Sequence, residues 1–177
     1  YEAVSVEEIA AQAKVSKPVV YEHFGGKEGI YAVIVDREMN ALLAKVTNSL
    51  TADSPRLLLE QAGLALFDFI EEETDGFRIL VRDSPVSVNT GNFASLILDV
   101  AAQVDDVLER EFKARGFNAK YSEMYAQMLV GMVALTGQWW LDARKPKKRE
   151  VVAHVVNLAW NGLSNMEPKP TLSQDTT

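Results

Sequence analysis

Apolar residues recur along most of the chain with the 3.6-residue period of an α-helix. Between residues 27 and 50, for example, Met39, Leu42 and Val46 fall on one stripe of a single helix. No segment alternates apolar and polar residues with the period of two that is typical of a half-buried strand. The pattern therefore predicts an all-α protein.

The first fifty residues predict two short helices and a longer one. Ser5 and Glu8 have the spacing of a capping box, in which each side chain bonds the other residue's backbone amide, so the first helix begins there. Ser16 is placed to cap the second short helix. The glycine pair at 25–26 supplies the permissive backbone of a helix exit, and the longer helix follows over residues 27–50.

The rest of the chain is divided by residues that favour turns. Proline, glycine and asparagine gather at 84–92, which predicts a loop, and a run of basic residues connects the last two helices. The predicted segments are a helix at 55–74, a short apolar segment at 77–82, the loop at 84–92, a helix at 93–116, a helix capped by Asn118 and ending near Arg144, the basic connector 144–149, and a helix at 150–163.

The last two helices are apolar on most of their circumference. A helix of this kind is buried on every side, and an edge helix in a short chain achieves that when a second chain covers it. We therefore predict a symmetric homodimer through residues 119–144 and 150–163, with Gly131 and Gly137 allowing close approach of the backbones. The alternative is that the two helices form the core of a monomer.

Composition excludes several classes of protein. With no cysteine and two histidines, the chain offers no disulfide framework, no cysteine zinc site and no iron–sulfur cluster. The longest apolar stretch, residues 128–141, is too short to cross a bilayer, and neither end resembles a signal peptide. We expect a soluble cytoplasmic protein with no membrane partner. The net charge of −7 argues against bulk coating of nucleic acid but allows a small basic surface.

The first two helices have the layout of a helix-turn-helix, whose second helix enters the major groove of DNA. The motif is carried by Ser-Val-Glu-Glu-Ile-Ala at 5–10, Val-Ser-Lys at 15–17, Tyr-Glu-His-Phe at 21–24, Lys-Glu at 27–28 and Tyr31. These residues closely resemble the DNA-binding region of the TetR family of bacterial transcription regulators. The helices that follow have the number and order of that family's ligand-binding and dimerisation domain.

The resemblance sets the expected domain organisation. It implies a helix-turn-helix domain with its connecting helix at 1–50, a ligand-binding and dimerisation domain at 51–166, and a flexible tail at 167–177. It also implies one more helix and a basic arm ahead of Tyr1, so part of the basic surface is expected to lie there.

The family pattern assigns DNA contacts to the start and outer side of the second helix. It places Ser5, Ser16, Tyr21, His23 and Lys27 near phosphates, and Lys17, Pro18 and Val19 at base edges. Hydroxyl and amide groups at helix starts suit anions, and an apolar side chain suits a thymine methyl group. The alternatives are that the tyrosine and the histidine only pack and that Lys17 is solvated. Lys14 stands where the family often has a turn glycine, and Pro18–Val19 replaces a small residue followed by threonine.

The family also implies a ligand cavity among the helices of the second domain. The residues expected to surround it are Phe67, Ile70, Phe77, Phe93, Val100, Tyr121, Met124, Tyr125 and Met128. Methionines at 124 and 128 share a helix face and would adapt to a flexible apolar guest. The alternative is that this stripe is core or dimer seam.

Three further segments resemble the FasR-type subgroup, which controls fatty-acid synthesis and responds to long-chain acyl-CoA. They are residues 75–85, 138–142 and 160–163. The resemblance implies a hydrophobic effector, with Arg78 and Arg82 as phosphate partners at the mouth of its tunnel. The alternative for the two arginines is an exposed face paired with Asp83 or Glu71.

These observations predict a ligand-responsive regulator that binds an inverted-repeat, double-stranded DNA operator as a dimer. A regulator of an efflux or catabolic operon that senses another hydrophobic molecule is the main alternative. An enzyme is disfavoured because the chain has no phosphate loop and no nucleophile elbow, and the carboxylates of 71–73 point in different directions. We expect no catalytic residue, metal or cofactor. A helix-turn-helix module that binds only protein is a further alternative.

Overall fold

The computed structural model describes residues 4–81 and 93–173, with the side chains of 93–96 excepted. Every regular element in these ranges is helical, which confirms the predicted all-α class. The predicted loop at 84–92 lies outside the described residues. The elements are α1 (Val6–Gln12), α2 (Lys17–Phe24), α3 (Lys27–Ser49), α4 (Pro55–Glu72), α5 (Thr74–Val81), α6 (Phe93–Arg115), the 3-10 helix η1 (Ala119–Tyr121), α7 (Ser122–Ala143) and α8 (Lys148–Ser164).

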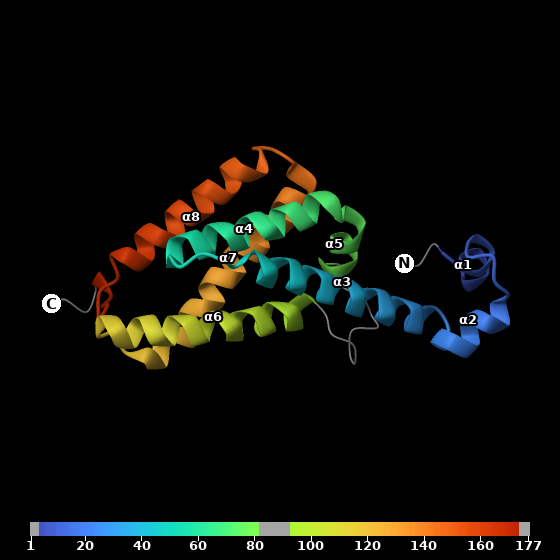
Figure 1. The fold of residues 1–177 in the computed structure, drawn as a ribbon, viewed down its shortest axis with the longest axis horizontal. Coiled ribbons are helices and arrows are strands. Elements are labelled where there is room, and N and C mark those ends of the chain that lie inside the picture. The colour runs from blue at the N-terminus through green and yellow to red at the C-terminus, as the bar shows by residue number, and fades with distance from the viewer. Residues whose placement is uncertain (1–3, 82–92, 174–177) are drawn as a thin grey trace.

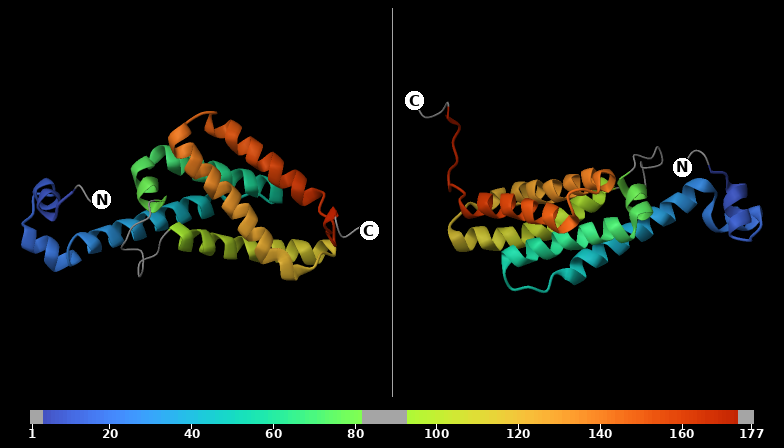
Figure 2. Two further views of the ribbon diagram at one scale, coloured as in Figure 1. Left: turned by 180° about the vertical axis from the view of Figure 1, so that it is seen from behind. Right: turned by 90° about the horizontal axis from the view of Figure 1, so that it is seen from above.

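The helices form a small N-terminal unit and a larger bundle that share α3. Helices α1 and α2 lie at one end of the molecule, and α3 leads from them into the bundle of α4, α6, α7 and α8 (Figure 1). The view from above separates α3 and α4 from α7 and α8, which lie on the opposite side of the bundle (Figure 2). None of the described helices has both the length and the apolar character that crossing a bilayer requires.

The predicted helix ends are largely confirmed. The Glu8 amide donates to Ser5 Oγ at 3.2 Å and the Ser5 amide donates to Glu8 Oε2 at 2.7 Å, which completes the capping box. Gly25 and Gly26 have φ values of 70° and 125°, so both occupy the backbone region that glycine tolerates best. Ser16 is the N-cap residue of α2, but its side chain makes no capping hydrogen bond.

Asn118 caps a different element from the one predicted. Its Oδ1 accepts from the Lys120 amide at 3.1 Å and so opens the short 3-10 helix, not the long one. The long helix α7 begins four residues later at Ser122, whose buried hydroxyl donates to Ala119 O at 2.9 Å and to Asp105. The hydrogen bonds of this serine to the preceding turn and to α6 fix the start of α7.

The centre of the core is aromatic. Phe67, Phe69 and Phe77 are fully buried, and Phe67 lies 5.2 Å from Trp140, measured between ring centroids. Gly137 is also buried here, because a Cβ atom on it would meet Ile70 Cδ1 at 3.0 Å. The prediction that Gly137 faces a partner chain is therefore wrong, since it faces α4 of its own chain. A Cβ atom at Gly131 would enter open space.

The basic connector between α7 and α8 is tied to α4. Arg144 lies 5.0 Å from the Trp140 ring centroid and donates to Thr74 Oγ1 at 2.9 Å. Lys148 pairs with Asp68 at 2.6 Å and with Glu71, and these hydrogen bonds raise the pKa of Lys148 above its usual value. Two cations of the connector therefore hold the end of α7 and the start of α8 in place.

Candidate DNA-binding surface and ligand cavity

A small core holds α1 and α2 together. Val6 and Ala10 of α1 and Val20 of α2 are buried against one another, and Ile30 of α3 packs on them. All the other residues of α2 are exposed. The outward side of α2 is therefore presented to solvent with the geometry of a reading helix.

The residues predicted to contact DNA lie mostly on this side. Ser16, Lys17, Pro18, Val19, Tyr21 and His23 are exposed, and Ser5 and Lys27 are half-buried. The Lys17 side chain is 48% exposed and Tyr21 is 47% exposed, so both are accessible to a partner. The Ser5 hydroxyl is already bonded to Glu8, at 2.9 Å from Oε2.

The turn and the helix exit fix how α2 is presented. Lys14 adopts a φ of 55°, so the position where the TetR pattern often has glycine does take the left-handed conformation. At the other end of α2, a Cβ atom on Gly29 would lie 1.6 Å from Phe24 O. The first turn of α3 therefore approaches the end of α2 as closely as glycine alone permits.

One contact on this surface links the two short helices. Lys17 Nζ donates to a Glu7 carboxylate oxygen, and it lies 5.7 Å from the centroid of the Tyr21 ring. The hydrogen bond from Lys17 lowers the pKa of Glu7, and the same bond raises the pKa of Lys17. The sequence pattern did not single out Glu7, because the two residues are ten positions apart and meet only through the turn.

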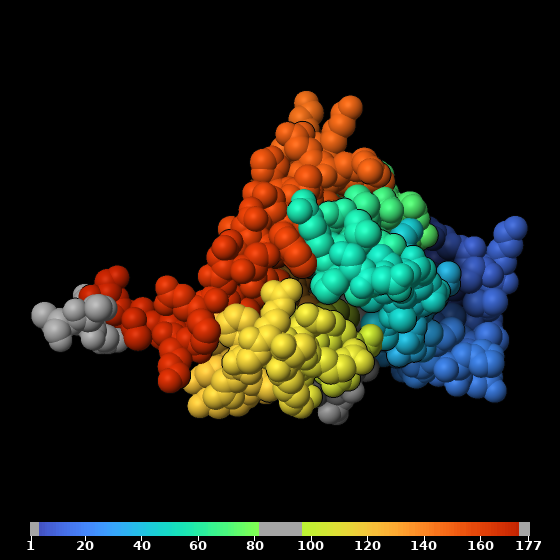
Figure 3. All heavy atoms as spheres, turned by 60° about the vertical axis from the view of Figure 1, so that its left-hand side comes forward, coloured from blue at the N-terminus to red at the C-terminus, as the bar shows by residue number. Residues whose placement is uncertain are grey.

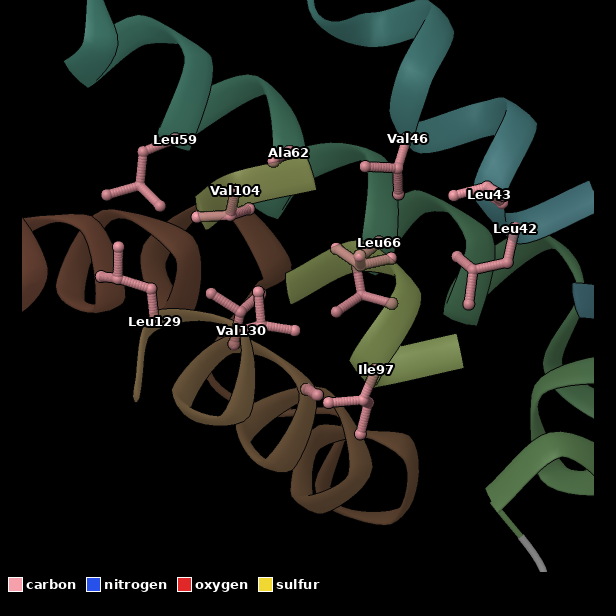
Figure 4. Close-up of a pocket in the computed structure, with 13 residues that line it drawn as sticks. Leu42, Leu43, Val46, Leu59, Ala62, Leu66, Ile97, Val104, Leu129 and Val130 are labelled. Atoms are coloured by element: carbon pink, nitrogen blue, oxygen red, sulfur yellow. The ribbon is translucent and has the colours of Figure 1, made fainter. Parts of the chain in front are cut away.

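An apolar cavity of about 130 Å³ opens within the bundle. In Figure 4, side chains from α3, α4, α6 and α7 point toward one another across it, and Figure 3 shows the surface hollowed between α4 and α6. Its lining residues are all aliphatic: Leu42, Leu43, Val46, Leu59, Ala62, Leu66, Ile97, Val100, Val104, Leu129, Val130, Val133 and Ala134. Such a lining suits a hydrocarbon guest and offers no side chain that would bind a polar one.

The structure separates the residues predicted to surround the ligand. Val100 lines the cavity. Phe67, Ile70 and Phe77 are fully buried in the core instead, and Met128 is 56% exposed on the outer side of α7. Periodicity identified these residues as one stripe of a helix, but it could not tell whether the stripe faces a cavity, the core or solvent.

Three predicted ligand residues line a second hollow, at the end of the bundle far from α1 and α2. Tyr121, Met124 and Tyr125 border this space of about 570 Å³ together with the segment that follows α8. Arg78 lies elsewhere, in a hollow lined by α1, α3 and α5 that Lys27 also borders, and it pairs with Asp75 at 3.4 Å. The predicted roles of Arg82 and of the Phe93 side chain fall outside the described residues.

Helix α3 belongs to both candidate sites. It begins at Lys27, beside the reading helix, and its residues Leu42 and Val46 form a wall of the aliphatic cavity. Helix α5 also touches it, since Tyr31 Oη donates to Ile79 O at 3.3 Å. Within the described part of the chain, no three His, Asp or Glu side chains gather as they would around a metal ion.

The comparisons agree with this two-part arrangement. Residues 1–34 match the family model described as bacterial regulatory proteins of the tetR family, and residues 55–162 match the tetracyclin repressor-like C-terminal domain. The chain belongs to the TetR family. It is a TetR-type transcriptional regulator and not an enzyme.

Relatives and solved structures extend this assignment. The chain is 32% identical over 168 residues to the HTH-type transcriptional activator FasR of Mycolicibacterium smegmatis, which covers 94% of this chain and 76% of that protein. A TetR-like regulator from Rhodococcus sp. RHA1 has the same fold, with a TM-score of 0.74, 22% identity and coverage of 94% and 87%. The TetR family regulator PfmR from Thermus thermophilus gives a TM-score of 0.69 at 24% identity, with coverage of 92% and 91%.

Proposed function

We propose that this TetR regulator binds an inverted-repeat operator as a dimer. Its affinity for this DNA changes when a hydrophobic effector fills the aliphatic cavity. The observation that carries the proposal is the shared helix α3. Leu42, Leu43 and Val46 of α3 touch the cavity, and the same helix begins beside α2. A guest that displaces these side chains therefore acts on the element that positions the reading helix.

The effector we propose is a molecule with a long alkyl chain, such as a long-chain acyl-CoA. Burial of hydrocarbon contributes about 0.8 kcal/mol per methylene, so an aliphatic cavity gains affinity from each carbon it takes in. The 32% identity to FasR and the resemblance to the FasR-type subgroup support the same class of effector. Because the lining is aliphatic, we place the polar head group outside the cavity.

We assign the dimer interface to the outer side of α7 together with α8. Leu135 is 64% exposed, Trp139 is 54% exposed and Leu158 of α8 is 66% exposed. Large apolar side chains that gather on one side of a protein mark interaction surfaces. The exposed side of α8 also carries His154, Asn157 and Asn161, so the surface is less apolar than the sequence predicted.

Replacing Leu135 with glutamate is expected to convert the dimer to monomer at micromolar concentration, because it buries charge in the proposed interface. Sedimentation velocity would measure the change. Leu57→Glu is the matched control, since Leu57 is also half-exposed but lies on α4, which is not part of the proposed interface. An L135E variant that stays as dimeric as wild type would contradict the assigned interface.

The proposed function is tested with DNA selected by the protein from a random pool of duplexes. We expect an inverted repeat to emerge, and we expect palmitoyl-CoA to change the affinity for it about 5- to 150-fold, the range of a coupling energy of 1–3 kcal/mol. Fluorescence anisotropy would measure both, with free CoA as the control ligand. Selection of no preferred sequence would contradict operator binding, and an unchanged affinity with palmitoyl-CoA and with a panel of hydrophobic ligands would contradict the effector site.

A further inference from the structure

The ion pair between Glu7 of α1 and Lys17 of α2 lies on the candidate DNA-binding surface. Lys17 is the first residue of the reading helix, and Glu7 lies in the first turn of α1. Both side chains are about half exposed, at 48% and 59%, so the pair is in contact with solvent. The ammonium is held between the Glu7 carboxylate and the Tyr21 ring, whose centroid lies 5.7 Å away.

We propose that Glu7 is a positioning residue that makes DNA binding by Lys17 selective for sequence. An ammonium group has three N–H donors, and Glu7 accepts from it in the free protein. The remaining donors can then serve a base edge at the start of α2. The inference rests on the proposed function, because it assumes that α2 reads an operator.

Charge explains why the pair disfavours random DNA. Sequence-independent binding depends on cations that neutralise phosphates and release counterions. A lysine whose charge is already balanced by Glu7 contributes little to this term. A base edge with two acceptors, such as that of guanine, holds them at fixed positions in the major groove. An oriented donor therefore hydrogen-bonds more favourably to such an edge than to a phosphate.

Conformational freedom explains why the pair favours the operator. A lysine side chain loses much rotamer freedom when it is held in one place. The contacts with Glu7 and Tyr21 restrict Lys17 before DNA arrives, so less of this entropy is lost on binding. The same pairing lowers the pKa of Glu7 and raises that of Lys17, so it favours the charged form of both groups.

The test compares Glu7→Gln with wild type on two duplexes, the sequence selected by wild type and a scrambled version of it. For E7Q we expect affinity for the scrambled duplex to rise about 1.4- to fivefold, the range of an exposed charge pair. We expect affinity for the selected duplex not to rise. The ratio of affinity for the selected duplex to affinity for the scrambled duplex therefore falls. The slope of log affinity against log salt on the scrambled duplex should steepen by about 0.9, which corresponds to one more neutralised phosphate.

Two further variants separate positioning from a general effect of charge. Glu22→Gln removes the same charge from an exposed site on α2, and we expect it to raise both affinities in parallel. In a Lys17→Gln background, E7Q should no longer lower the ratio, because the lysine that Glu7 positions is absent.

Three outcomes would overturn the inference: an unchanged or higher ratio in E7Q, the same fall in ratio for E22Q, or a fall that persists without Lys17. Failure of the proposed function would give a different result, because the wild-type protein itself would then bind both duplexes with equal affinity.

Discussion

Replacing Phe67 with alanine is expected to lower the free energy of unfolding by about 3–5 kcal/mol, the cost of removing a buried aromatic side chain from a packed core. Phe67 is fully buried and lies 5.2 Å from Trp140, between ring centroids. Both helices that meet there, α4 and α7, would lose contacts around the space left behind. Chemical denaturation followed by circular dichroism would measure the change at fixed protein concentration.

The control for this variant is Leu57→Ala on the same helix. Leu57 is 49% exposed, so its truncation should change the free energy of unfolding by less than about 1 kcal/mol. Equal effects of the two substitutions would show that Phe67 does not belong to the stabilising core. The result also bears on the cavity, because Phe67 was predicted to line it and the structure places it in the core instead.

Replacing Ala62 with phenylalanine is expected to abolish the response to a hydrophobic effector. Ala62 lies on α4 at the side of the aliphatic cavity, whose volume is about 130 Å³, so a benzyl group would occupy most of the space that a guest needs. Loss of about five buried methylenes from the guest would lower its affinity by about 4 kcal/mol, roughly a thousandfold. Isothermal titration with palmitoyl-CoA would measure binding, and anisotropy would show whether operator affinity still responds.

Ala102→Phe is the matched control, because Ala102 is exposed on α6 and the same bulk there does not enter the cavity. A102F should bind the operator like wild type in the absence of ligand and should keep the response to palmitoyl-CoA. Retention of wild-type ligand affinity by A62F would place the effector elsewhere. The hollow beside Tyr121 and Met124 would then be the next site to test.

The helix ends were predictable from sequence where a local interaction determines them. The Ser5–Glu8 capping box and the glycine pair at 25–26 act within a few residues, and the structure confirms both. Asn118 shows the limit of predicting helix ends from local interactions. Its capping bond is local and present, but α7 begins at Ser122 because that side chain bonds Asp105 on another helix.

The sites were harder to predict because they depend on how helices rotate against one another. Periodicity places Ile70 and Phe77 on apolar stripes, but which stripe borders the cavity is decided by packing between distant segments. The cavity is lined by plain aliphatic residues such as Leu43 and Val130, which carry no chemical signal in a sequence. The residues that the resemblance to the TetR family assigns to DNA contact belong to one short, local motif, and the structure leaves most of them exposed on α2.

The length of helix α3 has a consequence for the proposed coupling between the cavity and the DNA. Leu43 at the cavity and Lys27 beside the reading helix are sixteen residues apart on it, about 24 Å at 1.5 Å per residue. A tilt of only about 5° about the cavity end would move the other end by about 2 Å, far more than the few tenths of an ångström over which a hydrogen bond keeps its strength. In the proposed mechanism, small displacements among methyl groups at the cavity would thereby become a misfit between the reading helix and the DNA groove.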